Sequence, residues 1–282
     1  MPRGAAFNMR LGLFDYYEPE NIAQALDLIA EATVIAGGQS LIPSMRLRQV
    51  TVTKLISISN IAELSGDIIK KADSIEIGAL TTLSDLLSSQ IIEEHTPWLR
   101  EAAQQVGDVQ VRNLATVVGN ICWSDPRANM SIALLASNAI ITTINSKLQE
   151  RKISLKDFFV SFQKNILENE LVKNILIPNH ELAAGRYLEF SRQRNDLALV
   201  NVSVVSSEKK TTLVIGGTRN VPLIIETDEH NKMNHAATIM NKIPDRLNDF
   251  HTDQYGSQQY RLELAISLAR RVLNSLRCKL DE

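Results

Sequence analysis

The 282-residue chain is long enough for two or three domains, and its composition, 44% hydrophobic and 22% charged, is that of a folded globular protein. A formal net charge of −2 excludes the strongly cationic surface that drives nucleic-acid binding. The hydrophobic stretches are too short for a membrane span, no secretory signal core is present, and two cysteines are too few for an iron–sulfur cluster, so we expect a cytoplasmic protein that carries no metal of its own.

Residues 1–57 predict a small α/β subdomain. Phe14 to Pro19 reads as an extended entry, after which Asn21 is placed to cap a helix that runs to Ala32. A short strand over Thr33 to Ala36 then runs into a Gly-Gly turn. Lys54 to Ile58 predicts a second strand.

Residues 58–178 predict a second subdomain, again of mixed type. Ile68 to Gly78 reads as a hairpin of two short strands. The remaining predicted elements are, in order, a helix after Thr82, a helix over Pro97 to Val106, a helix over Met130 to Ala139, a strand over Ala139 to Ile144, and a strand over Leu171 to Ile177 that Pro178 ends.

Residues 179–282 predict a C-terminal domain that begins with a three-stranded antiparallel sheet and ends in helices. The strands are expected over Tyr187 to Ser191, Leu199 to Val205 and Thr212 to Ile215. The polar run from Thr227 to Asn234 predicts a long exposed loop, and Tyr260 to Leu280 predicts an amphipathic helix. The fold class is therefore α+β.

Two glycine-containing turns, each expected at the end of a strand, carry the strongest functional signal. The first, AGGQS, spans Ala36 to Ser40, and the second, TVVGN, spans Thr116 to Asn120. Glycine lets main-chain N–H groups approach an anion closely, and a diphosphate suits such a nest. The first turn alone is better explained as a tight turn with a helix cap, but two such turns favour convergence on one extended ligand. The chain has neither GxGxxG nor GxxxxGK[ST], which disfavours a Rossmann site and excludes a P-loop; the third pair, Gly216-Gly217, is expected only to turn the chain.

The segments AGGQSLIPSMRLR, VRNLATVVGN and SDPRANM together resemble the flavoprotein (medium) subunit of the molybdenum hydroxylases. That family includes the FAD subunits of bacterial CO dehydrogenase and of xanthine dehydrogenase-type enzymes. The similarity continues in order along the chain through Gly78-Ala79, Phe158-Phe159, Leu171 to Pro178, Arg192 to Ala198, Leu213 to Pro222 and Tyr260-Arg261.

The resemblance implies a fold, a cofactor and partners. It implies a vanillyl-alcohol-oxidase/p-cresol-methylhydroxylase-type (PCMH-type) FAD-binding domain in two subdomains, and a chain that passes electrons to an external acceptor. It also implies a large partner subunit with the molybdenum cofactor, a small partner with two [2Fe–2S] clusters, and an (αβγ)2 assembly. The cofactor-binding residues that it implies are Ile35, Ala36, Gly37, Gly38, Gln39, Ser40, Leu41, Thr116, Val117, Val118, Gly119, Asn120, Asn129 and, from the last strand of the FAD domain, Val172.

The chain departs from this family at a few positions. Val118 stands where a glycine is usual, which requires its φ to be negative if its N–H is to serve the cofactor. Asn129 stands where an aspartate is usual, and Glu189 lies near a position that is often lysine. Arg112 is expected to brace the two turns, and Asp125 either caps the next helix or contacts the cofactor.

Two alternatives remain at the level of sequence. The chain is either the FAD-binding electron-transfer subunit or an FAD-free assembly or scaffold protein derived from the same family. In the second case, Val118, Asn129 and Glu189 are the substitutions that abolished FAD binding. A stand-alone oxidase of the same flavin fold is disfavoured, because only about 100 residues follow Pro178 to build a substrate domain. The residues determine neither the substrate of the complex nor the electron acceptor.

Overall fold

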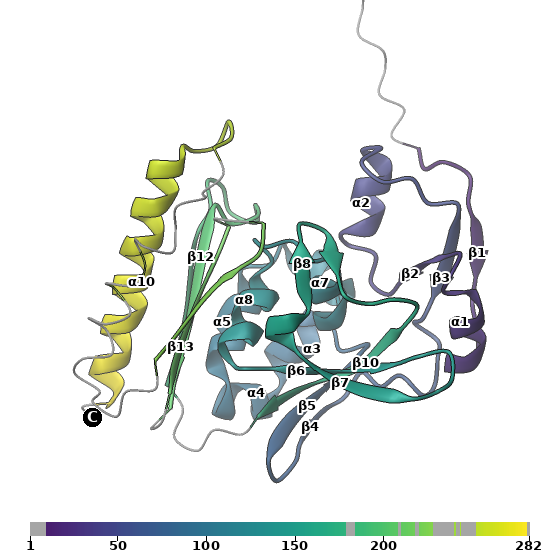
Figure 1. Cartoon of the computed structure of the whole chain (residues 1–282), viewed down its shortest axis with the longest axis horizontal. Coiled ribbons are helices and arrows are strands. Elements are labelled where there is room, and N and C mark those ends of the chain that lie inside the picture. Colours follow the sequence, from purple (N-terminus) through teal and green to yellow (C-terminus); the bar gives the residue numbers. More distant parts are fainter. Residues whose placement is uncertain are drawn as a thin grey trace, which may run out of the picture.

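The computed structural model describes residues 10–178, 184–207, 210–217, 220–227, 240, 243 and 252–280. Its main sheets follow one another along the molecule, and most of the helices lie between the second and the third sheet (Figure 1). The mixed helix and sheet content agrees with the predicted fold class. Within the described residues, no helix has both the length and the hydrophobicity that a membrane crossing requires.

The N-terminal sheet is small and parallel. Its strands lie in the order β1 (Asp15–Tyr17), β3 (Lys54–Ser57) and β2 (Thr33–Ile35), with helices α1 (Ile22–Leu28) and α2 (Leu41–Arg46) connecting them. The Asn21 cap is confirmed, since its side chain accepts the Gln24 N–H at 2.9 Å. Helix α1 ends at Leu28, earlier than predicted.

The central sheet is antiparallel and has five strands. In spatial order they are β4 (Ile68–Lys70), β5 (Ser74–Gly78), β10 (Leu171–Pro178), β6 (Ile140–Ile144) and β7 (Glu150–Ser154). After β7 come the 3-10 helix η1 (Leu155–Asp157) and the hairpin β8 (Phe159–Ser161) and β9 (Lys164–Asn165). The helices that accompany this sheet are α3 (Leu83–Ser88), α4 (Gln90–His95), α5 (Pro97–Gln104), α6 (Val109–Leu114), α7 (Val117–Cys122) and α8 (Asn129–Ala136).

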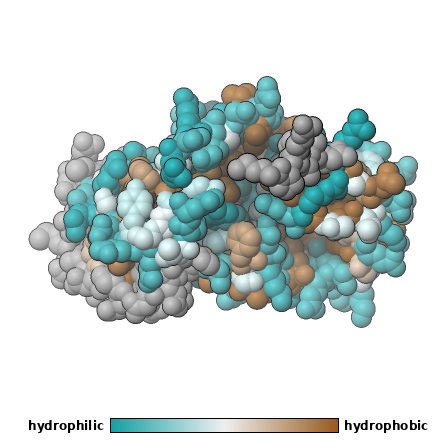
Figure 2. All heavy atoms as spheres, turned by 90° about the horizontal axis from the view of Figure 1, so that it is seen from above, coloured by the Kyte–Doolittle hydropathy of each residue, from teal (hydrophilic) through white to brown (hydrophobic). Residues whose placement is uncertain are grey.

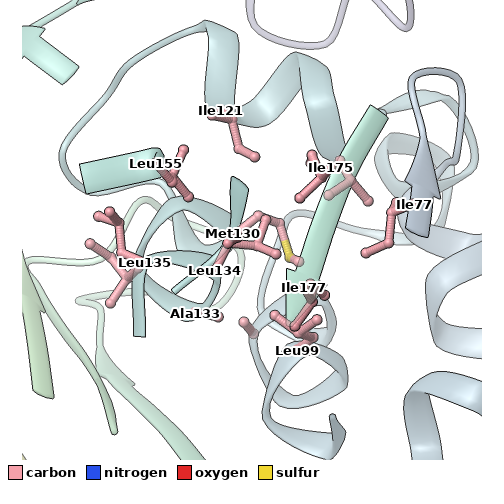
Figure 3. Close-up of a cluster of buried hydrophobic side chains, with 14 of the residues drawn as sticks. Ile77, Leu99, Ile121, Met130, Ala133, Leu134, Leu135, Leu155, Ile175 and Ile177 are labelled. Atoms are coloured by element: carbon pink, nitrogen blue, oxygen red, sulfur yellow. The ribbon is translucent and has the colours of Figure 1, made fainter. Parts of the chain in front are cut away.

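The main hydrophobic core lies between this sheet and its helices. Figure 3 shows side chains of α5, α7 and α8 converging on side chains of β5 and β10. Helix α8 is the centre of the core, because all eight of its residues are buried. A helix that is apolar all round needs neighbours on every side. It therefore packs against α5, α7 and η1 and also against the next sheet.

The C-terminal sheet has four antiparallel strands, where the sequence predicted three. They are β11 (Ala184–Phe190), β12 (Val200–Ser206), β13 (Thr211–Gly216) and β14 (Leu223–Thr227), paired in chain order. The unpredicted strand β14 lies at the edge of the sheet, directly after Pro222. Thr227, predicted to open an exposed loop, is instead the buried last residue of β14, and residues 228–234 lie outside the described part of the chain.

This sheet lies between two helical layers (Figure 1). One face packs on α5 and α8, and the other packs on α10 (Gln258–Leu280), whose predicted apolar stripe is confirmed. The contact with α5 is close: a Cβ on Gly185 would lie 2.2 Å from the ring of Trp98. Two ion pairs, Arg186–Glu101 at 2.7 Å and Lys156–Glu226, also join the C-terminal sheet to the preceding part of the chain. On the face seen from above, hydrophobic residues are scattered among hydrophilic ones (Figure 2).

Candidate functional site

The first glycine turn lies between strand β2 and helix α2. Gly38 has a φ of +68°, a conformation that glycine adopts without the cost a side chain would impose. Ile42 donates its N–H to the Gly38 carbonyl at 2.9 Å, so the turn leads directly into the helix. Gln39 folds back and donates from Nε2 to the Gly37 carbonyl at 3.1 Å. The main-chain N–H groups of Gln39, Ser40 and Leu41 have no acceptor among the described residues.

The two glycine segments are in contact. A Cβ on Gly37 would lie 1.8 Å from the carbonyl oxygen of Leu114 and 3.0 Å from the Cα of Ala115, the two residues that directly precede the second segment. No residue other than glycine fits such an approach without moving one of the two backbones. The sequence expectation that the segments converge agrees with this arrangement.

The second segment is the start of helix α7, where the sequence predicted a strand that ends in a glycine turn. Thr116 is the N-cap residue, and its Oγ1 accepts the Gly119 N–H at 3.0 Å. Val117 donates to the Thr81 carbonyl at 3.0 Å, and Asn120 donates to the Thr116 carbonyl at 3.0 Å. Of the predicted donors in this segment, the N–H groups of Thr116 and Val118 are the two without a protein acceptor among the described residues. Val118 has a negative φ, so its side chain does not strain the segment.

A buried atom at the second segment lacks a partner. The Oδ1 of Asn120 is shielded from solvent and accepts no hydrogen bond from the described residues. Buried polar atoms are normally satisfied, and an exception marks a place where a ligand or water completes the structure. An unpaired buried acceptor here, and three unpaired N–H donors across the contact, form a donor and acceptor set that fits a polar, anionic group such as a diphosphate-bearing cofactor.

Two further predicted cofactor residues belong to other elements than the glycine segments. Val172 is in β10, opposite Thr143 of β6, and its side chain belongs to the main hydrophobic core. Asn129 begins helix α8 and is 5% exposed. Its Nδ2 lies 2.6 Å from Oε2 of Glu189 in β11. The structure thus joins two positions that the sequence flagged separately.

Glu189 is part of a buried polar network that the sequence did not predict. The hydroxyl of Tyr187 donates to Glu189 at 2.8 Å and accepts from Nδ2 of Asn201 at 3.2 Å. Burial raises the pKa of Glu189 to about 7 against the lowering effect of the hydrogen bonds from Tyr187 and Asn129. Burial also holds the pKa of Tyr187 well above its usual range. A signal was available in the sequence, because Tyr187 and Glu189 share one face of a strand that is otherwise mostly apolar.

Several other singled-out residues have structural roles. Arg112 donates to the carbonyls of Val106 at 3.0 Å and Gly107 at 2.8 Å, so it braces the loop after α5 and not, as predicted, the two glycine turns. Asp125 does not cap α8; it binds the guanidinium of Arg127 through both oxygens, at 2.9 and 2.8 Å. Cys122 is a free thiol whose pKa burial raises to about 12, which makes it unreactive at neutral pH.

A cavity of about 400 Å³ lies in the C-terminal part of the molecule. It is bounded by the segment from Arg192 to Leu199, together with Arg127, Asp253, Tyr255 and Arg261. Asp196 lines this cavity and is exposed. Arg261 is 3% exposed and forms an ion pair with Asp253 at 2.6 Å.

Known proteins share both the sequence and the fold of this chain. Residues 9–180 match the family described as the FAD binding domain in molybdopterin dehydrogenase. The chain is 37% identical to the alpha subunit of the 6-hydroxypseudooxynicotine dehydrogenase complex of Paenarthrobacter nicotinovorans over 66% of this chain and 64% of that protein. It is 30% identical to the glyceraldehyde dehydrogenase medium chain of Sulfolobus acidocaldarius over 89% of this chain and 94% of that protein.

A solved structure has a closely similar fold at low sequence identity. A chain of the carbon monoxide dehydrogenase of Hydrogenophaga pseudoflava, in a form that lacks the Mo-pyranopterin moiety, superposes with a TM-score of 0.86 at 26% identity. The match covers 94% of this chain and 97% of that chain, so it includes the C-terminal sheet as well as both glycine segments.

Proposed function

The chain belongs to the family of FAD-binding domains of molybdopterin dehydrogenases, and from this membership we propose that it is an electron-transfer subunit that takes electrons from [2Fe–2S] clusters of a partner and passes them to an external acceptor. Like its relatives, it is an oxidoreductase subunit, and its cofactor is FAD. When bound, FAD supplies the redox chemistry, and the protein supplies binding, orientation and electrostatic tuning. In this proposal residues 1–57 and 58–178 form the two subdomains of a PCMH-type FAD-binding domain, and residues 179–282 form the C-terminal domain.

The observation that carries the proposal is the contact between Gly37 and the Leu114 carbonyl, which brings the two glycine segments together. The unpaired N–H groups of Gln39, Ser40 and Leu41 would bind the cofactor diphosphate from one side. Asn120 would offer its unpaired Oδ1 to a donor on the cofactor. These main-chain and side-chain groups would thereby orient the cofactor.

The partners follow from the same family. Relatives are described as a medium chain and as a subunit of a complex, which supports an assembly in which substrate oxidation occurs elsewhere. We assign the molybdenum cofactor to a large subunit and two [2Fe–2S] clusters to a small subunit, in a cytoplasmic (αβγ)2 complex. Two cysteines in the whole chain are consistent with this division, because a [2Fe–2S] cluster requires four ligands.

The test uses the purified full-length chain and an Asn120→Ala variant. The wild-type protein is expected to be yellow, with flavin absorbance near about 450 nm that denaturation releases. Because Asn120 Oδ1 has no protein donor within the described residues, N120A removes no intramolecular hydrogen bond made by that atom and should leave the melting temperature nearly unchanged. FAD binding by N120A is expected to weaken about tenfold, the usual effect of leaving a ligand donor unpaired.

The control is Ser84→Ala, which removes a hydroxyl that bonds Asn113 at 2.6 Å on an exposed surface and should keep full FAD affinity. A colourless wild-type chain that folds and fails to take up added FAD would contradict the proposal. That outcome would favour the FAD-free scaffold protein.

A further inference from the structure

Asn129 and Glu189 are far apart in the chain and adjacent in the fold. Asn129 is the first residue of α8, and Glu189 is the next-to-last residue of β11. Their side chains meet at 2.6 Å between Nδ2 and Oε2, a short distance of the kind that a charged acceptor produces. The contact therefore couples the helix at the centre of the main core to the first strand of the C-terminal sheet.

The contacts of Asn129 determine which end of its amide is free. Its Nδ2 is directed at two acceptors, Glu189 Oε2 at 2.6 Å and, more weakly, the Ala102 carbonyl at 3.5 Å. Its Oδ1 accepts no hydrogen bond from the described residues. The NH2 of the amide is thus engaged by the protein, and the carbonyl oxygen is the atom that remains available to a donor from outside the chain.

We propose that Glu189 is a positioning residue whose carboxylate holds the NH2 of Asn129 and so presents the Asn129 carbonyl oxygen to the bound FAD. This inference rests on the proposed function and on the predicted contact of Asn129 with the cofactor. An oxygen at this place accepts from an N–H or hydroxyl of the cofactor, whereas a reversed amide would present a donor and repel it. Glu189 acts through Asn129 and is not itself assigned a contact with FAD.

The arrangement depends on the ionisation of Glu189. Protonated Glu189 carries a donor of its own, which competes for the Asn129 carbonyl oxygen and releases the amide. Burial places the pKa of Glu189 at about 7, and the raised pKa of Tyr187 keeps that hydroxyl protonated. The charged groups on the neighbouring elements are already paired: Glu101 of α5 binds Arg186 of β11 at 2.7 Å, and Arg127, before α8, binds Asp125 at 2.8 Å.

The first test measures the Kd for FAD and the melting temperature of the wild-type protein between about pH 6 and pH 8.5. As pH rises through 7, FAD is expected to bind more tightly because the carboxylate forms, while the melting temperature falls because a buried charge forms. If Glu189 only stabilised the fold, its ionisation would lower the melting temperature and weaken FAD binding together. A Kd that rises with pH would show that Glu189 repels the cofactor as a charge, and it would overturn the proposal.

Glu189→Gln removes the titrating group and keeps the side-chain size. Its Kd for FAD is expected to be about fivefold higher than that of the wild type at high pH and independent of pH in this range. The matched control is Glu226→Gln, which also lies at the seam with the C-terminal sheet but has a pKa held low by Lys156 and Lys210 against burial. E226Q should keep the pH profile of the wild type. An E189Q variant with the wild-type profile would refute the assignment.

A double-mutant cycle tests the coupling independently of pH. Asn129→Asp places two carboxylates in contact, and Glu189→Lys removes the acceptor of the Asn129 NH2, so each is expected to weaken FAD binding about tenfold. The double variant pairs opposite charges and is expected to recover to within about threefold of the wild type. Additive losses would overturn the proposal. A wild-type chain that binds no FAD at any pH would instead refute the proposed function. If E189K does not fold, the pH dependence of the Kd for FAD in E189Q tests the role of Glu189.

Discussion

Among the residues of the candidate site, Gly37 has the most restrictive environment. Its missing Cβ is what allows the Leu114 carbonyl to approach, at a distance where a methyl group would lie 1.8 Å from that oxygen. The sequence indicated a requirement for glycine here, because a Gly-Gly pair at the end of a strand is unusual. It did not indicate that the requirement comes from close packing against the backbone of Leu114, since the two residues are far apart in the chain.

We expect Gly37→Ala to destabilise the protein by roughly 2 kcal/mol or more, because one of two packed backbones must move. The comparison is Gly66→Ala, where the added Cβ would lie 3.6 Å from Leu80, an ordinary contact, so that the effect should stay within about 0.5 kcal/mol. Chemical denaturation of the two variants measures the difference. Equal stabilities would mean that the segments separate easily and that their contact does not define the site.

The polar network around Glu189 marks the limit of sequence reasoning at this scale. Asn129 and Glu189 were each noticed because their residue types were unusual for the family. Their pairing depends on how α8 packs against the C-terminal sheet, and a local pattern contains no information on that packing. Asn129 and Glu189, the two positions at which the chain differs in charge from the family, form a hydrogen bond with each other.

At the scale of elements, periodicity predicted the long segments and failed at the short ones. Helix α10 was predicted because its apolar stripe repeats over many turns, β5 because its isoleucines alternate with polar residues, and β6 and β10 because each is rich in apolar residues. Helix α7 was missed because a six-residue helix has too few turns to show a period, and two adjacent valines suggested a strand. Strand β14 was missed because it is short, lies at an edge and follows a proline.

The cap at Thr116 explains how six residues with three β-branched side chains and a glycine remain helical. Its Oγ1 satisfies the Gly119 N–H, and we expect Thr116→Val, which keeps the shape but removes the acceptor, to cost about 1 kcal/mol. Because α7 carries Val118 and Asn120, we expect the loss of its cap in T116V to lower the affinity for FAD as well. The exposed Thr51→Val serves as the control for the same chemical change. Thermal melts and FAD titration measure both effects, and a T116V protein as stable as T51V would contradict the role of the cap.

At the scale of the whole molecule, the C-terminal sheet is built into the protein and is not a loose appendage. It is held between α5 and α8 on one face and α10 on the other, and Gly185 packs against the ring of Trp98. Trp98 is itself fixed by the hydrogen bond from its Nε1 to Ser137 at 2.8 Å. Three of the four strands of this sheet were predicted from the sequence, but their position was not, because both faces of β12 and β13 are buried and an alternating pattern is therefore absent.

The same architecture sets how the stability of the molecule depends on pH. Glu226 and Asp253 have pKa values lowered by their hydrogen bonds and ion pairs against the raising effect of burial, so they stabilise the fold above their unfolded pKa values, and that stability is lost as pH falls through the folded ones. Glu189 has the opposite sign: its pKa rises from 4.5 to about 7, so its contribution is complete below 4.5 and is lost as pH rises to 7.

The stability lost at low pH through Glu226 and Asp253, and that lost at higher pH through Glu189, together predict maximum stability at about pH 5. Ionising Glu189 in the folded protein costs at most roughly 3 kcal/mol, the free-energy equivalent of its raised pKa. We therefore expect Glu189→Gln to match the wild type near the optimum and to exceed its stability at about pH 8, where the buried charge is absent. Denaturant unfolding of both proteins across this range measures the difference. If the two curves ran parallel above the optimum, the carboxylate of Glu189 would be well solvated in the folded protein, and the C-terminal sheet would not close over it as tightly as its contacts with α5 and α8 require.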